Sequence, residues 1–221
     1  TKNVIVSAPT SFGKSLLIEE IVASKRYKNI VIIQPTLALL DETRKKLIKY
    51  SSTYKLIVRT TQEPNDDKNI FLFTAERVNE YQLFPKIDFL VIDEFYKLSG
   101  KRDDERSSSL NNAFHYLLTK HSPRFYLLGP NIDSISPGFV EKYNAEFYKS
   151  RYSLVDTKVE NIYEKYPKQF ALTGPKAKFK ESVLFDLLLS LKDEQTIIYC
   201  SSPSKVRELA KRFTKFLNGK K

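Results

Sequence analysis

The feature that most constrains this chain is the stretch SAPTSFGKS at residues 7–15, which directly follows the apolar run VIV at 4–6. A sharp turn from a strand into a helix aims several backbone N–H groups at one point, and the helix N-terminus adds positive potential there. Such a point binds phosphate groups. The stretch therefore predicts a phosphate-binding loop, and a glycine-containing turn without a ligand is the alternative.

The residue types within this loop match the chemistry of a bound nucleotide. Gly13 allows a close backbone approach, Lys14 is expected to neutralise the β and γ oxygens, and the Ser15 hydroxyl is expected to bind Mg²⁺. The pattern usually starts with glycine, but Ala8 satisfies the turn if its φ angle is negative. The predicted nucleotide-binding residues are Pro9, Thr10, Ser11, Phe12, Gly13, Lys14 and Ser15.

A second apolar run, FLVIDEFY at 89–96, ends in two adjacent acids. Asp93, at the end of a strand, can reach Mg²⁺ through water, and Glu94 can accept a proton from the attacking water or orient it. An ordinary strand end with solvated charges is the alternative. A nucleotide kinase needs no such glutamate, and the chain has no Asn-Lys-x-Asp signature of a GTPase.

Short apolar, β-branched runs begin near residues 4, 29, 55, 69, 88, 124 and 195. Most lack polar alternation, which is typical of strands buried on both faces. Between them, segments such as 37–48, 183–191 and 206–217 have the apolar spacing of helices. The alternation predicts an α/β fold, a parallel sheet flanked by helices.

Domain organisation follows from a polar segment that carries two prolines and a glycine. We expect a first domain at 1–155, a linker or crossover at 156–177, and the truncated beginning of a second α/β domain at 178–221. One strand and two helices do not close a sheet by themselves. Because the chain begins at Thr1 and has no methionine, we expect it to be part of a longer protein.

The chain is basic, with 37 Lys and Arg against 26 Asp and Glu, a net charge of +11. This favours a polyanionic partner such as nucleic acid. Much of the excess lies in residues 203–221, where a solvated helix face is the alternative. A single cysteine, Cys200, and the lack of a long apolar run favour a cytoplasmic, intracellular protein with no membrane partner.

Taken in order, these motifs resemble those of a superfamily 2 helicase of the DExD/H type, closest to its DExH branch. APTSFGKS resembles motif I, IVIIQPTLALLDE at 30–42 motif Ia, and FTAER at 73–77 motif Ib, with Ala75 in place of proline. VIDEFY takes the place of the DEAD/DEAH motif. LLGPN at 127–131 lies where motif III is expected, and residues 196–213 resemble motif IV.

The resemblance implies a RecA-like P-loop NTPase fold, ATP and Mg²⁺ as cofactors, and a nucleic-acid-dependent ATPase or helicase. It also implies backbone contacts with DNA or RNA. Those from motif Ia would come from Gln34, Pro35 and Thr36, and those from motif Ib from Thr74, Glu76 and Arg77. A plain N-cap at Thr74 and a solvated helix residue at Arg77 are the alternatives.

Two positions that link the ATP site to nucleic acid in the family hold other residues here, Tyr96 and Asn131. Both can form hydrogen bonds, so a different coupling chemistry is expected. The adenine-reading motif and the arginine fingers are expected outside this chain, together with the remainder of the second RecA-like domain. The chain alone is therefore expected to be nearly inactive. A duplex-translocating subunit of a restriction or defence complex, and a nucleotide-gated scaffold without hydrolysis, stay open as alternatives.

Overall fold

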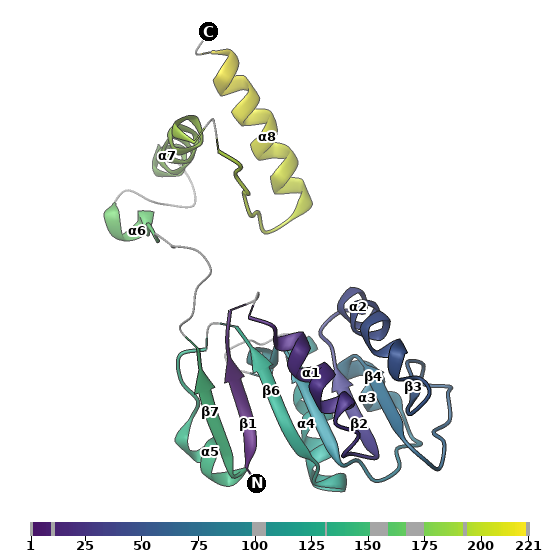
Figure 1. Ribbon diagram of the computed structural model, residues 1–221. Helices are drawn as coiled ribbons and strands as arrows, with labels where there is room; N and C mark the ends of the chain where they lie inside the picture. The colour runs from purple at the N-terminus through teal and green to yellow at the C-terminus, as the bar shows by residue number, and fades with distance from the viewer. Residues whose placement is uncertain are drawn as a thin grey trace. The chain divides into compact units, whose positions relative to one another are not determined.

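Seven strands form one sheet in the order β3-β4-β2-β5-β6-β1-β7 (Figure 1). The strands are β1 (Asn3–Ser7), β2 (Asn29–Ile33), β3 (Lys55–Ile57), β4 (Asn69–Phe73), β5 (Phe89–Asp93), β6 (Arg124–Gly129) and β7 (Ala145–Lys149). Every neighbouring pair is parallel. The computed structural model describes residues 2–9, 12–98, 105–130, 132–150, 159–166, 175–191 and 194–219.

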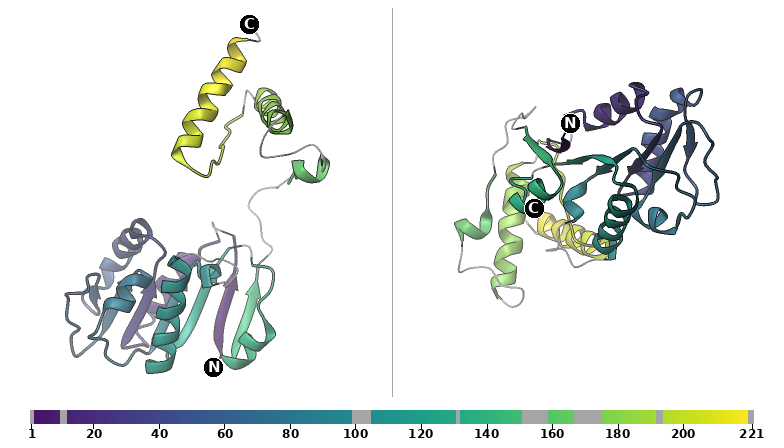
Figure 2. Two further views of the ribbon diagram at one scale, coloured as in Figure 1. Left: turned by 180° about the vertical axis from the view of Figure 1, so that it is seen from behind. Right: turned by 90° about the horizontal axis from the view of Figure 1, so that it is seen from below.

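Helices cover both faces of this sheet (Figure 2). One face packs against α1 (Lys14–Ala23) and α2 (Leu37–Leu47), and the other packs against α3 (Ala75–Glu80), α4 (Glu105–His121) and α5 (Pro137–Lys142). Two short 3₁₀ turns follow α2 and β5: η1 (Ile48–Tyr50) and η2 (Phe95–Leu98). The predicted α/β P-loop fold with a flanked parallel sheet is confirmed.

The continuous apolar runs become strands because both of their faces are covered. All five residues of β2 and of β4 are buried. Successive side chains of β2 point to opposite faces, so Val31 and Ile33 join one core cluster while Ile30 and Ile32 join the other. The carboxyl ends of these parallel strands lie at one edge of the sheet, and that edge holds the candidate site.

Strand β7 is the element that the sequence did not reveal. It pairs with β1 at the edge of the sheet, from Asn3 opposite Ala145 to Ser7 opposite Lys149. Only Ala145 in it is buried. An edge strand with alternating charges carries little of the apolar signal by which buried strands are recognised.

The chain divides into two compact units, Thr1–Asp156 and Thr157–Lys221. The second contains α6 (Ile162–Lys165), α7 (Pro175–Ser190) and α8 (Pro203–Asn218). Phe185 of α7 packs against Phe213 and Phe216 of α8, with ring centroids 5.1 Å apart in both pairs. Of the helices described in the chain, none is both long and apolar enough to cross a membrane.

The prediction of a strand at 195–200 is wrong. Residues 195–200 have no regular secondary structure, and Ile197 and Tyr199 are 97% and 91% exposed. A strand needs a neighbour for its backbone hydrogen bonds, and the described part of the second unit contains no other strand. The assignment of 178–221 to the beginning of a second α/β domain stays a prediction.

Candidate active site

The predicted phosphate loop leads from β1 into α1. Gly13, at the N-cap of α1, has φ +82°, a left-handed conformation that side chains disfavour. Among the described residues, an added Cβ at Gly13 would approach only Leu16 Cβ, at 4.0 Å, so the backbone conformation is what favours glycine there. Ala8 does not have a positive φ, so the condition for alanine at the first position is met. Thr10 and Ser11 lie outside the described residues.

Lys14 is buried at the centre of this loop. Its Nζ donates hydrogen bonds to the carbonyl oxygens of Ala8, at 2.9 Å, and Pro9, at 2.7 Å. Burial lowers the pKa of Lys14, while the nearby carboxylates of Asp93 and Glu94 act in the opposite direction. The two acids that the sequence assigned to the same site as Lys14 thus lie near enough for their charges to act on it.

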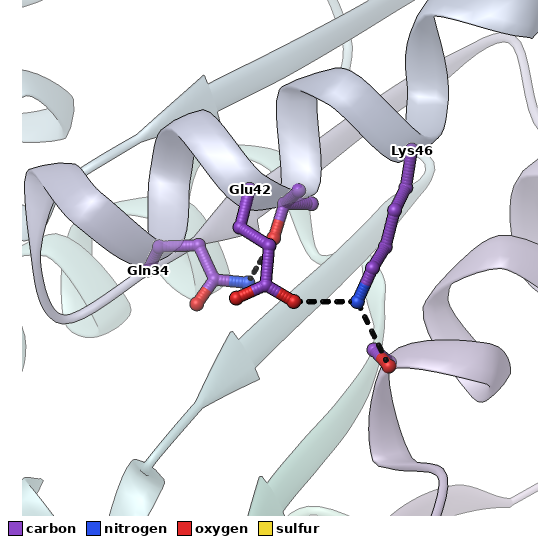
Figure 3. Close-up of polar contacts among 5 residues, drawn as sticks. Gln34, Glu42 and Lys46 are labelled. Carbon is purple, nitrogen blue, oxygen red and sulfur yellow. Dashed lines mark hydrogen bonds and ion pairs between the residues drawn. The ribbon is translucent and has the colours of Figure 1, made fainter.

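Ser15 is exposed at the start of α1, opposite the ion pair of Lys46 with Glu42 on α2, which Figure 3 shows. Lys46 Nζ lies 2.6 Å from Glu42 Oε1 and 3.5 Å from Ser15 Oγ. The predicted magnesium ligand therefore faces a cationic group. A further ion pair joins Glu19 of α1 to Lys49 of η1, the turn that directly follows α2. The sequence did not single out Lys46, because its approach to Ser15 depends on how α1 and α2 pack.

The donor set fits a magnesium ion that is held largely by nucleotide phosphates. No group of three His, Cys, Asp or Glu side chains that could hold a metal occurs within the described residues. Mg²⁺ is usually bound by one or two protein oxygens together with phosphates and waters, so the Ser15 hydroxyl and the Asp93 carboxylate suit it.

Asp93 and Glu94 lie at the carboxyl end of β5. Burial raises the pKa of Asp93, and the Glu94 backbone N–H opposes this by donating to Asp93 Oδ1 at 2.9 Å. Glu94 has φ +55°, which is uncommon for a residue other than glycine and stores strain at functional sites.

The Glu94 carboxylate is held by two neighbours. Lys97 Nζ lies 2.7 Å from Glu94 Oε2, and the Tyr96 hydroxyl lies 3.3 Å from the same oxygen. The sequence predicts that Tyr96 links the ATP site to nucleic acid, but it does not single out Lys97. Its signal was available, because a lysine three residues after a glutamate can reach it across one helical turn.

The end of β6, where motif III is expected, touches both the loop and the acidic strand end. The Gly129 carbonyl accepts a hydrogen bond from Ala8 N at 3.0 Å, and Ser7 Oγ accepts one from Ile132 N at 2.8 Å. A Cβ on Gly129 would lie 2.9 Å from Ile132 Cδ1 and 3.3 Å from Phe95 Cδ1. A side chain at position 129 would therefore require the Ile132 side chain to shift. Asn131 lies outside the described residues.

A small cavity of about 30 Å³ joins the other predicted segments to Asp93. It is lined by Ile33, Gln34, Pro35, Ala75, Glu76, Asp93, Lys97 and Leu110. Gln34 is 2% exposed; its Nε2 donates to Thr43 Oγ1 at 3.0 Å, and its Oε1 has no partner among the described residues. The residues after β2 and those at the start of α3 are thus brought next to the acidic strand end.

The remaining residues of the predicted nucleic-acid interface have structural contacts of their own. Thr36 caps α2 by accepting a hydrogen bond from Leu39 N at 3.3 Å. Thr74 holds the N-cap position of α3 without a side-chain cap bond. Arg77 Nη1 donates to the carbonyl of Val58 at 2.8 Å, so this guanidinium holds the segment after β3. Contact of these residues with nucleic acid stays a prediction.

Comparison with known proteins identifies the family of this chain. The family profile of the DEAD/DEAH box helicases matches residues 1–128. The chain belongs to the DEAD/DEAH box helicase family. Anti-bacteriophage protein B of Escherichia coli (strain K12) is 35% identical to this chain over an alignment of 227 residues, which covers 99% of this chain and 30% of that protein.

Solved structures of this helicase family have the same fold. The E. coli DExH-box NTPase HrpB superposes with a TM-score of 0.57 at 12% identity, over 97% of this chain and 27% of its own. The DUF1998 helicase MrfA superposes with a TM-score of 0.55 at 14% identity, over 99% of this chain and 36% of its own. At identities this low the superpositions show the fold alone, and the chain spans only about a third of the length of each of these proteins.

Proposed function

We propose that this DEAD/DEAH box helicase domain binds Mg·ATP at the phosphate loop and uses its hydrolysis to move along or remodel a nucleic acid. The observation that carries the proposal is the buried Lys14, whose ammonium is held by the Ala8 and Pro9 carbonyls near enough to Asp93 and Glu94 for their charges to act on it. A buried lysine beside two acids at a phosphate-binding turn has the composition of a phosphoryl-transfer site.

The chemistry follows from these positions. The oxygen of a water bonds to the γ-phosphorus while the bond from phosphorus to the β–γ bridging oxygen breaks, which leaves ADP and phosphate. Glu94 accepts the proton that the water loses, and Lys14 offsets the negative charge on the phosphate oxygens. Bound Mg²⁺ would neutralise further charge from the side of Ser15 and Asp93.

Nucleic acid is proposed to lie across the carboxyl edge of the sheet. Thr36 is exposed at the N-terminus of α2, and Arg77 lies half-buried on α3, so both segments offer N–H groups or positive charge to a phosphate. Such contacts do not read base sequence. The proposed polymer is therefore recognised by its backbone, as DNA or as RNA.

Saturating Mg·ATP is expected to raise the melting temperature of this chain, and Lys14→Ala is expected to abolish the shift. At a free ligand concentration about 100-fold above Kd, binding adds about 2.7 kcal/mol of stability. For a chain of this size that corresponds to roughly 5–10 °C. Thermal unfolding followed by circular dichroism measures it.

Lys45→Ala is the matched control, because Lys45 is an exposed residue paired with Asp41 at 2.9 Å. It should retain the shift. An equal shift in Lys14→Ala, or no shift in the wild-type chain at millimolar Mg·ATP, would contradict nucleotide binding at the phosphate loop.

A second candidate is a motor that translocates along duplex DNA, without strand separation, as part of a phage-defence system. It is supported by the 35% identity to a protein named for its action against bacteriophage. Full-length protein would be tested on duplex DNA that carries a triplex-forming strand. Displacement of the third strand without separation of the duplex supports translocation, whereas separated single strands support a helicase.

A further inference from the structure

Lys97 contacts a residue of the proposed ATP site and also lines the cavity beside the proposed nucleic-acid interface. Lys97 forms a 2.7 Å ion pair with Glu94, and the two side chains are only 25% and 29% exposed. The backbone supports this geometry, because Lys97 N donates to the Glu94 carbonyl at 3.1 Å. The ion pair is thus built into the turn that follows the acidic strand end.

The same Lys97 lines the small cavity between the segments after β2 and at the start of α3. Those segments, represented there by Gln34, Pro35 and Glu76, belong to the proposed nucleic-acid interface. The cavity is also lined by the buried Gln34, whose Oε1 is an acceptor without a partner among the described residues. A buried acceptor of this kind calls for a donor, and the lysine ammonium is a mobile donor that lines the same cavity.

The Lys97 ammonium has two possible partners, the Glu94 carboxylate and a phosphate of a nucleic acid, and only the second leaves the Glu94 carboxylate free of the lysine. While Lys97 and Tyr96 both bond to Glu94 Oε2, that oxygen is occupied and is a poor acceptor for the proton of a water. A phosphate of a nucleic-acid backbone offers several acceptor oxygens and a full negative charge, so it competes effectively for a flexible lysine.

We propose that Lys97 is a positioning residue that couples nucleic-acid binding to ATP hydrolysis. Without nucleic acid it holds Glu94. A backbone phosphate bound over the segments after β2 and at the start of α3 withdraws the ammonium, and Glu94 becomes free to take the proton from the attacking water. This inference rests on the proposed function and names the residue through which its two sites communicate.

The test measures ATP turnover of the full-length protein with and without saturating single-stranded DNA, single-stranded RNA and duplex DNA. Lys97→Gln is expected to raise turnover without nucleic acid about two- to fivefold, the range expected when a partly exposed ion pair is lost. The stimulation by nucleic acid should fall by the same factor. The salt dependence of single-strand binding should fall in slope by about 0.7, because one phosphate contact is lost.

Lys97→Arg and Lys45→Gln are the controls. Arginine keeps the charge and should keep turnover without nucleic acid low, whereas Lys45→Gln removes one exposed charge of a Lys–Asp pair elsewhere on the molecule and should behave as the wild type does. If Lys97→Gln only lowers the melting temperature, with an unchanged stimulation ratio and salt slope, the ion pair is structural and the inference is overturned. If the wild type binds ATP but no nucleic acid stimulates its turnover, the proposed function itself fails.

Discussion

Glu94→Gln is expected to lower ATP turnover by the full-length protein about 10²–10⁴-fold at saturating ATP and nucleic acid, the range expected when a general base is removed. Glutamine keeps the size of the side chain and can still accept hydrogen bonds from Lys97 and Tyr96. It cannot take a proton from water. The effect should therefore fall on the chemical step, and the measurement is phosphate release under saturation.

A measurement of nucleotide binding distinguishes a catalytic role of Glu94 from a structural one. The Mg·ATP-dependent shift in melting temperature should persist in Glu94→Gln, because the phosphate loop is intact. Glu80→Gln, at the exposed end of α3, is the matched control and should leave turnover unchanged. If turnover in Glu94→Gln stays within a few fold of that of the wild type, Glu94 is not the group that accepts the proton of the attacking water. That outcome would favour a nucleotide-binding scaffold over the proposed motor.

The central strands could be predicted from the sequence because they are buried on both faces. Ile30, Val31, Ile32 and Ile33 form one uninterrupted apolar run, and each of them is at most 1% exposed. In the outermost strand, β7, only Ala145 is buried, so the apolar run is lost and the sequence did not predict this strand. At 195–200 the same signal was misleading, because apolar, β-branched composition says nothing about whether a pairing partner is present.

The candidate site could be predicted where one local segment carries the chemistry. Gly13 and Lys14 follow from the phosphate loop alone, and Asp93 and Glu94 follow from the end of an apolar strand. The contacts of Lys46 and Lys97 could not be placed in the same way. Lys46 reaches Ser15 only because two helices pack together, and Lys97 reaches the cavity only because three strand ends meet at one edge.

The segment proposed to touch nucleic acid depends on an aromatic cluster beneath α3. Phe71 of β4 is fully buried, and its ring centroid lies 5.5 Å from that of Tyr81 and 5.1 Å from that of Phe84. Phe73 lies 5.2 Å from Tyr81. Since α3 begins two residues after β4 ends, this cluster fixes the direction in which the helix leaves the sheet.

Phe71→Ala is expected to lower the free energy of unfolding by about 3–5 kcal/mol, because it removes a buried ring and leaves a cavity among three other rings. Urea unfolding of this chain, followed by circular dichroism, measures the change in the transition of the first unit. Leu83→Ala is the control from the same segment: Leu83 is 49% exposed, and its truncation should change stability by no more than about 0.5 kcal/mol. Equal losses in the two variants would mean that the cluster does not anchor α3, and the proposed interface at 74–77 would lose its structural basis.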